Sequence, residues 1–264
     1  MTLHARNLTL SLGSKRVLDG VSFTARTGEL TAIIGPNGCG KTTTLKVISG
    51  EIRKAGSVTL FGRPLEAYKP WELALRRGVL AQHTTIAFPF TVREIVGMGV
   101  TAGTGATSAS AEEQAIERAL AAVDLEGFAG RFYQDLSGGE QQRVQLARVL
   151  CQVSAPVRDG EPAFLFLDEP VSSLDIRHQL SIMALARRFA DAGGGVIAIL
   201  HDLNLTAMYA DHVVMMRAGT VAAGGAPQAV FTDDTLQSVF GCTMRVGVAP
   251  PIGTPFILPQ TAIH

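Results

Sequence analysis

The chain has 264 residues, carries 23 basic and 23 acidic side chains, and is 47% hydrophobic. A balanced charge excludes a net field that would draw the chain to nucleic acid or to an anionic membrane surface, so we expect no nucleic-acid partner. Its longest apolar runs have the length of a strand, well short of the roughly 20 residues of a spanning helix. Residues 1–12 do not show a basic start followed by an apolar signal core, so we expect the chain to stay in the cytoplasm. The three cysteines are scattered without metal-ligand spacing, which suits a reducing compartment.

The first part of the chain predicts antiparallel strands. Residues 3–12 and 17–25 alternate loosely between apolar and polar side chains, and Gly13-Ser14 separates them, which is typical of a hairpin. A buried strand follows from Thr31. Residues 56–61, closed by the turn at 62–64, predict a second small β unit.

A glycine-rich turn after the Thr31 strand is the strongest motif of the chain. It matches the phosphate-loop pattern G-x-x-x-x-G-K-[ST], with a strand before it and a helix after it. Such a loop points successive backbone N–H groups at an anion, and the helix adds the positive end of its dipole. Lys41 would reach the β- and γ-phosphates, and the Thr42 hydroxyl would bind Mg²⁺. The predicted phosphate-binding residues are Gly35, Pro36, Asn37, Gly38, Cys39, Gly40, Lys41, Thr42 and Thr43.

The middle of the chain predicts a mostly helical insert over about residues 83–150. A short strand, Val79 to Gln82, precedes it, and the pattern Thr91-Val-Arg-Glu94 indicates a capping box that opens a helix. Residues 101–110 are rich in Gly, Ala, Ser and Thr without periodicity, which favours a mobile loop. Helical spacing returns over residues 111–123.

The insert ends in a sharp turn, Leu136-Ser-Gly-Gly-Glu140, that opens an amphipathic helix over residues 141–150. Two glycines at a helix start leave backbone N–H groups free for an anion. This turn is therefore a second candidate anion site, separate in sequence from the phosphate loop.

Two later apolar runs predict parallel strands buried on both faces. Residues 163–167 end in Asp168-Glu169-Pro170, and residues 196–200 end in His201-Asp202. Ligands bind beyond the carboxyl ends of strands in open α/β sheets, so we expect these polar residues to meet Gly35 there. A hairpin over 213–221, a helix from Pro227 and a proline-rich tail from Pro250 close the chain.

These groups suit hydrolysis of a nucleotide. Asp168 is placed to hold Mg²⁺ directly or through water. Glu169 is interpreted as the base that orients and polarises the attacking water, because hydrolysis needs an acceptor in line with the γ-phosphorus. His201 would donate to the γ-phosphate, or else be a satisfied structural group. Gln82 is either a plain polar residue at a strand end or a sensor that touches Mg²⁺ and the water.

The order and spacing of these motifs resemble those of ATP-binding-cassette (ABC) ATPases over nearly the whole chain. The resemblance implies an α/β fold: a phosphate-loop NTPase (RecA-like) core with an N-terminal antiparallel β subdomain and an inserted α-helical subdomain. It implies a single ABC ATPase domain over 1–264. Residues 1–82 and 151–264 would form the β subdomain and core, and about 83–150 the helical subdomain.

The same resemblance implies a homodimer that binds ATP and Mg²⁺ at composite sites. Ser137, Gly138 and Gly139 would contact the ATP of a second copy, related by twofold symmetry, and Asp175 would link the two sites. The chain departs from the family at Leu12, where many members stack an aromatic ring on adenine. Apolar contact from Leu12 or Val17 would cover the base instead.

The segment from Gln82 to Val96 resembles that of bacterial haem-importer ATPases, as do residues 153–162 and 172–180. This implies an energy-coupling subunit on the cytoplasmic face of the bacterial inner membrane, partnered by two transmembrane permease subunits and, indirectly, by a periplasmic haem-binding protein. Similar cassettes serve ferric-siderophore and cobalamin importers, and a soluble ABC ATPase that moves no solute is a remoter alternative. A small-molecule kinase would leave Leu136 to Glu140 unexplained. We expect His83 at a subunit interface and no haem ligand among the histidines.

Overall fold

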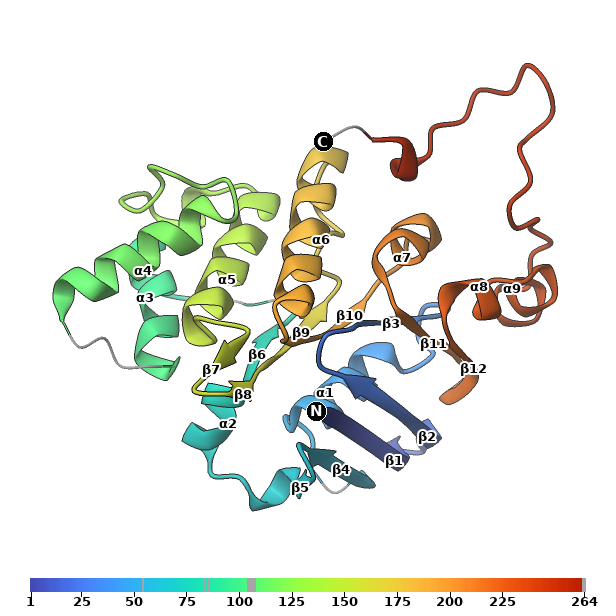
Figure 1. The fold of residues 1–264 in the computed structure, drawn as a ribbon, viewed down its shortest axis with the longest axis horizontal. Helices are drawn as coiled ribbons and strands as arrows, with labels where there is room; N and C mark the ends of the chain where they lie inside the picture. Colours follow the sequence, from blue (N-terminus) through green and yellow to red (C-terminus); the bar gives the residue numbers. More distant parts are fainter. Residues whose placement is uncertain (54, 83, 85, 104–107, 263–264) are drawn as a thin grey trace.

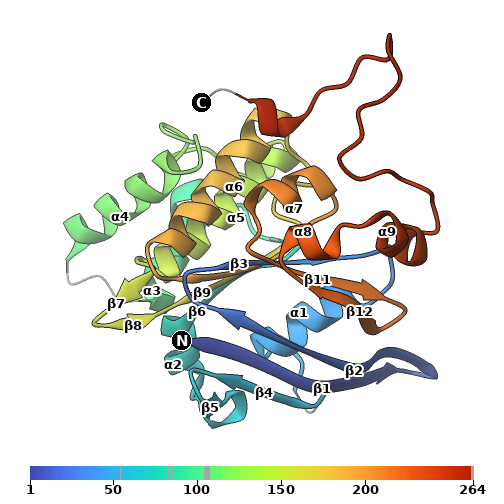
Figure 2. The same ribbon diagram turned by 45° about the vertical axis from the view of Figure 1, so that its right-hand side comes forward.

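The N-terminal strands form one antiparallel sheet. The structure is a computed structural model that describes residues 1–53, 55–82, 84, 86–103 and 108–262. The sheet has the order β2-β1-β4-β5 (Figure 2). Its strands are β1 (Thr2–Leu12), β2 (Lys15–Arg26), β4 (Ser57–Leu60) and β5 (Arg63–Pro64). The predicted hairpin is confirmed. The second β unit is also confirmed, as β4, and it joins the same sheet because β4 pairs with β1 with Leu3 opposite Leu60.

The core of the molecule is a six-stranded sheet of order β12-β11-β3-β10-β9-β6, parallel except for β12 at its edge. Its strands are β3 (Leu30–Ile34), β6 (Arg77–Leu80), β9 (Phe164–Asp168), β10 (Gly195–Ile199), β11 (His212–Arg217) and β12 (Thr220–Gly225). Every residue of β3, β9 and β10 is buried, as their continuous apolar sequences predict. Alternate residues face two separate apolar clusters: Ile197 packs toward α1 and the N-terminal sheet, and Val196 toward the other helices.

Helices cover both faces of the core sheet and form the layer to its side (Figure 1). They are α1 (Lys41–Ser49), α2 (Pro70–Arg76), α3 (Val92–Gly103), α4 (Ala109–Ala121), α5 (Gly138–Gln152), α6 (Ile176–Asp191), α7 (Leu203–Tyr209), α8 (Pro227–Val230) and α9 (Asp233–Phe240). Helices α3, α4 and α5 pack on one another. A two-residue hairpin, β7 (Val157–Arg158) with β8 (Glu161–Pro162), follows α5. In the described ranges, no helix combines the length and the hydropathy needed to cross a bilayer.

Helix α3 begins as its capping box predicts. The Thr91 backbone N–H and hydroxyl both donate to the Glu94 carboxylate at 2.7 Å, and the Glu94 N–H donates back to the Thr91 hydroxyl at 3.3 Å. The helix continues to Gly103, so the prediction of a loop from residue 101 is wrong for its first residues. Glycine serves close packing here, because a Cβ on Gly99 would overlap the Arg148 carbonyl of α5. Helix α4 begins at Ala109, so the prediction is wrong for residues 109–110 as well, while residues 104–107 and His83 lie outside the described residues.

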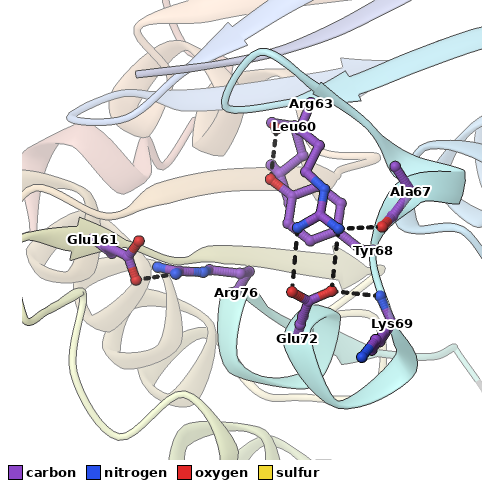
Figure 3. Close-up of polar contacts among 8 residues, drawn as sticks. All are labelled: Leu60, Arg63, Ala67, Tyr68, Lys69, Glu72, Arg76 and Glu161. Atoms are coloured by element: carbon purple, nitrogen blue, oxygen red, sulfur yellow. Dashed lines mark hydrogen bonds and ion pairs between the residues drawn. The ribbon is translucent and has the colours of Figure 1, made fainter.

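Helix α2 has no counterpart in the predicted elements. Polar contacts fix it at both ends (Figure 3). The Glu72 carboxylate accepts the Lys69 backbone N–H at 2.7 Å and the Arg63 guanidinium at 3.2 Å, and Arg76 pairs with Glu161 of β8. Because α2 leads straight into β6, that strand begins at Arg77, before the predicted Val79; it ends at Leu80, so the predicted end at Gln82 is wrong.

Candidate functional site

Three adjacent parallel strands bring the candidate residues to one edge of the sheet. Strands β3, β10 and β9 are neighbours, and they are followed by Gly35, His201 and Glu169 respectively. A cavity of about 600 Å³ lies beyond these strand ends. It is lined by Val17, Asn37, Gly38, Gly40, Lys41, Thr42, Thr43, Gln82, Glu169 and His201. The structure thus gathers in one place residues that the sequence assigns to phosphate, water and metal.

The phosphate loop needs glycine at two close approaches. Gly35 has φ +146°, and a Cβ there would overlap the Met216 carbonyl. Gly40 has φ +105°, and its Cβ would lie 2.9 Å from the Val17 carbonyl oxygen. The loop is further tied to the turn between β11 and β12, because the Gly219 N–H donates to the Cys39 carbonyl at 3.0 Å. Helix α1 begins at Lys41 with its N-terminal residues on the cavity, which is the geometry that favours an anion.

The loop holds one buried cation at the cavity. The Lys41 ammonium donates to the carbonyl oxygens of Gly35 at 2.8 Å and Pro36 at 3.2 Å. Cys39 is 4% exposed and does not line the cavity, and neither do Gly35 and Pro36. Burial raises the pKa of the Cys39 thiol, and Lys41 partly offsets that rise. These three residues therefore shape the loop, while Lys41 and the residues that line the cavity face a ligand.

Thr42 and Asp168 form a pair of oxygen groups suited to Mg²⁺. The Thr42 hydroxyl donates to the Asp168 Oδ1 at 3.2 Å, and Thr42 and Gln82 line the same cavity. Burial raises the pKa of Asp168; the hydrogen bond from Thr42 lowers it, and the charge of Glu169 raises it further. A hydroxyl beside a buried carboxylate offers the hard oxygen ligands that Mg²⁺ prefers, so the residues present fit this ion.

Glu169 and His201 are joined directly. The Oε1 of Glu169 lies 2.6 Å from the Nε2 of His201, and the two side chains are 15% and 42% exposed. Glu169 has φ +52°, in the left-handed region. For a residue other than glycine, such a backbone costs on the order of 1–3 kcal/mol and tends to occur at functional sites. The Glu169 carbonyl accepts hydrogen bonds from the Gln142 amide at 2.7 Å and the Ser172 hydroxyl at 3.2 Å, which hold the conformation.

The turn at Ser137 opens α5 through a second capping box. The Ser137 hydroxyl and backbone N–H donate to the Glu140 carboxylate at 2.6 and 2.7 Å, and the Glu140 N–H donates back at 3.4 Å. The Ser137 hydroxyl, and then its N–H, lower the pKa of Glu140. Ser137 and Gly138 are exposed, and none of Ser137, Gly138 and Gly139 lines the cavity of its own chain.

Two further sequence-predicted residues lie outside the cavity lining. Asp175 is the N-cap of α6, where its Oδ1 accepts the His178 N–H at 3.0 Å and lies 2.9 Å from the His178 Nδ1. The His178 backbone N–H is the largest of the contacts that lower the pKa of Asp175. Leu12 has a 57% exposed side chain at the end of β1, so of the two residues expected to cover adenine only Val17 lines the cavity.

Gln142 is the residue at this site that sequence reasoning missed. Its partner, the Glu169 carbonyl, lies 27 residues further along the chain and in another element. The neighbouring sequence does not distinguish Gln142 from Gln141. The Gln141 amide donates to the Tyr133 and Leu136 carbonyls instead. Only the three-dimensional packing of α5 against the end of β9 identifies it.

Comparison with known proteins agrees with this site. The model of the ABC transporter family matches residues 18–172. The chain is 62% identical to the hemin import ATP-binding protein HmuV of Rhizobium meliloti (strain 1021) over 98% of this chain and 99% of that protein. It is 57% identical to HmuV of Mesorhizobium japonicum over 99% of this chain and all of that protein.

Solved structures give the same result. The bacterial ABC transporter cassette MJ0796, in dimeric form, superimposes with a TM-score of 0.75 at 25% identity, covering 86% of this chain and 99% of its own. A second structure of that cassette, in a dimeric post-hydrolysis state bound to ADP and Pi, gives the same values. The fold, the phosphate loop and these relatives together place the chain in the ABC transporter family.

Proposed function

We propose that this chain is the ATP-hydrolysing, energy-coupling subunit of a bacterial importer whose cargo is haem. The observation that carries the proposal is the 62% identity to a hemin import ATP-binding protein over nearly both full lengths. The cavity supports it, because its lining brings together Lys41, Thr42 and Glu169, the residues assigned to phosphate binding, metal binding and proton acceptance.

The chain binds ATP through its phosphate loop. The backbone of residues 35–42 and the α1 N-terminus surround the phosphates, and the Lys41 ammonium, already held at the loop by Gly35 and Pro36, pairs with their charge. Thr42 and Asp168 hold Mg²⁺, with Gln82 on the same cavity. When bound, the ion neutralises charge that builds up on the phosphate oxygens.

Glu169 acts as the base of the reaction. Its carboxylate orients a water in line with the γ-phosphorus and accepts a proton from it as the new P–O bond forms and the bond to ADP breaks. His201 lies 2.6 Å from that carboxylate and lines the same cavity, so it orients the base before ATP binds and donates to the γ-phosphate once the nucleotide is in place.

Two copies of the chain complete each site. Ser137 and Gly138 are exposed and do not line the cavity of their own chain, and the N-terminus of α5 is suited to bind the phosphates of another chain. In a twofold homodimer the Ser137 turn of each copy meets the ATP of the other, so both sites are completed at once. Asp175, exposed at the start of α6, then lies between the two sites and links them. The dimeric cassette structures support this arrangement.

The rest of the assembly follows from the same role. The helical subdomain, about residues 83–150, docks on two transmembrane permease subunits, while residues 1–82 and 151–264 form the β subdomain and core. The chain sits on the cytoplasmic face of the inner membrane. A periplasmic haem-binding protein acts on it only indirectly, by favouring the permease state in which the two copies close on ATP.

Reconstitution tests the cargo. The chain is assembled with the permease encoded beside it and with the partner binding protein, and ATP hydrolysis is measured as phosphate release. We expect stimulation by haem-loaded binding protein and none by the unloaded protein. Stimulation by cobalamin or a ferric siderophore, with none by haem, would overturn the cargo and leave the ATPase role standing.

A further inference from the structure

The side chain of Gln142 connects two parts of the site that are far apart in sequence. Its amide Nε2 donates to the Glu169 carbonyl at 2.7 Å, the shortest hydrogen bond that this carbonyl receives among the described residues. The carbonyl belongs to the residue whose left-handed backbone places a carboxylate beside His201. A hydrogen bond at this carbonyl therefore acts on the backbone that aims the carboxylate.

Gln142 sits on the same short stretch of helix as the exposed Ser137 turn. Residues three and four apart lie on one face of a helix, so Gln142 follows Gly138 and Gly139 along one side of α5. That side is packed closely, because a Cβ on Gly139 would lie 3.0 Å from the Ser173 carbonyl oxygen. The first turns of α5 thus touch the segment from Glu169 to Ser173 at two points, and a shift of α5 moves both.

The other half of the Gln142 amide has no partner. Its Oε1 is buried, and in the described part of the chain no group donates to it. A buried acceptor without a partner costs stability, whereas an apolar side chain of similar shape does not. If position 142 served packing alone, methionine would therefore do as well as glutamine there. What methionine lacks is the N–H group aimed at Glu169.

We propose that Gln142 is a positioning residue for the base. It holds the Glu169 backbone so that the carboxylate faces the water only when α5 is packed against the segment from Glu169 to Ser173. The Ser137 turn of α5 is the part that meets the ATP of the partner copy. When the Ser137 turn of one copy binds the ATP held by its partner, α5 of that first copy is fixed in place, and Gln142 then fixes the position of Glu169 in the same copy. This inference rests on the role of Glu169 as the base under the proposed function.

A pair of matched variants tests it in the full-length chain. Gln142→Met removes the hydrogen bond to Glu169 and keeps the shape. Gln145→Met, one turn further along α5, changes a buried glutamine whose amide donates to the Tyr133 hydroxyl at 3.3 Å and accepts from the Arg148 Nε at 2.9 Å, with no hydrogen bond to Glu169 among the described residues. We expect Gln142→Met to lower kcat for ATP by about 10- to 100-fold, the order of loss that a misplaced catalytic group causes. Its KM for ATP and its melting temperature should stay at the wild-type values, and Gln145→Met should keep the wild-type kcat.

A double-mutant cycle separates this role from a general loss of structure. If Gln142 acts through Glu169, Gln142→Met in a Glu169→Gln background adds no further loss in a single-turnover assay. An inactive Glu169→Gln with a fully active Gln142→Met would overturn the positioning role alone. A Glu169→Gln chain that turned over normally would overturn the base assignment as well. Equal losses of kcat and melting temperature in Gln142→Met and Gln145→Met would mean a structural role only and would also overturn the proposal.

Discussion

The His201 Nε2 lies 2.6 Å from the Glu169 Oε1, although the two residues are 32 positions apart in the chain. They meet because β9 and β10 are neighbouring parallel strands whose carboxyl ends are in register, with Ile199 opposite Asp168. The register of the core sheet therefore brings the base and its partner together, and both face the cavity beside the phosphate loop.

The Glu169→Gln substitution should separate binding from hydrolysis. The amide keeps the size of the side chain but cannot accept a proton from water, so we expect ATP affinity near that of the wild type and turnover at least about 10²-fold lower. The ATP-bound homodimer should accumulate and be visible by light scattering. Lys41→Ala is the contrasting variant, because it removes the phosphate-binding cation and should weaken nucleotide binding itself. Phosphate release by Glu169→Gln at close to the wild-type rate would refute the base assignment.

The His201→Ala substitution should lower kcat while ATP binding is retained. Without the imidazole, the Glu169 carboxylate loses the partner that orients it, and the cavity loses a donor, so a loss on the order of 10²-fold is expected. His4→Ala is the matched control: among the described residues its ring hydrogen-bonds to Thr2 and Thr24, on the N-terminal sheet, and to no residue of the cavity. Steady-state phosphate release measures both variants. Equal activity of His201→Ala and His4→Ala would contradict the pairing.

Asp168 should make the nucleotide-free chain less stable when it is ionised. Because burial raises its pKa above the value in the unfolded chain, the folded state is penalised at neutral pH, and the penalty disappears as the pH falls through the raised pKa. Asp168→Asn removes the charge, so it should raise the melting temperature at pH 7 by more than it does at pH 4. The same variant should lose the Mg²⁺ dependence of ATP binding. A melting temperature lowered at pH 7 would contradict this account.

If each ATP site is built from two copies of the chain, heterodimers of two differently defective chains should show ATPase activity. A Ser137→Arg chain is defective in the turn offered to its partner, and a Lys41→Ala chain in its own phosphate loop. Their heterodimer holds one intact site and one doubly defective site, so mixing two inactive proteins should restore part of the ATPase activity. A chain that stayed strictly monomeric at full activity on dilution would exclude composite sites.

The local sequence pattern was enough to predict elements whose ends are marked by neighbouring residues. The buried strands before Glu169 and His201, the capping box at Thr91 and the helix start at Ser137 each follow from neighbouring residues, and the structure has them within one or two residues of the prediction. The parallel order of the core sheet then gathers Thr42, Asp168, Glu169 and His201, which is why most of the candidate site could be anticipated.

Long-range contacts account for what the sequence did not predict. Gly99 looks like a helix breaker until α5 is seen to pass against it, and the pairing of β4 with β1 joins residues far apart in the chain. Helix α2 is short and leads directly into β6, and partners on β5 and β8 hold it (Figure 3). The role of Gln142 likewise could not be predicted, because its partner, the Glu169 carbonyl, belongs to a distant part of the chain that packs against α5.

The central claim is that hydrolysis at Glu169 drives haem import, and uptake into proteoliposomes tests it most directly. The complex of this chain and its permease is reconstituted with ATP on the side of the ATPase, and haem-loaded binding protein is added on the other side. The account predicts that internal haem rises with the wild-type chain and stays at background with Glu169→Gln, although both bind ATP. Haem uptake of equal size with the two chains, or uptake of cobalamin but not of haem by the wild type, would contradict it.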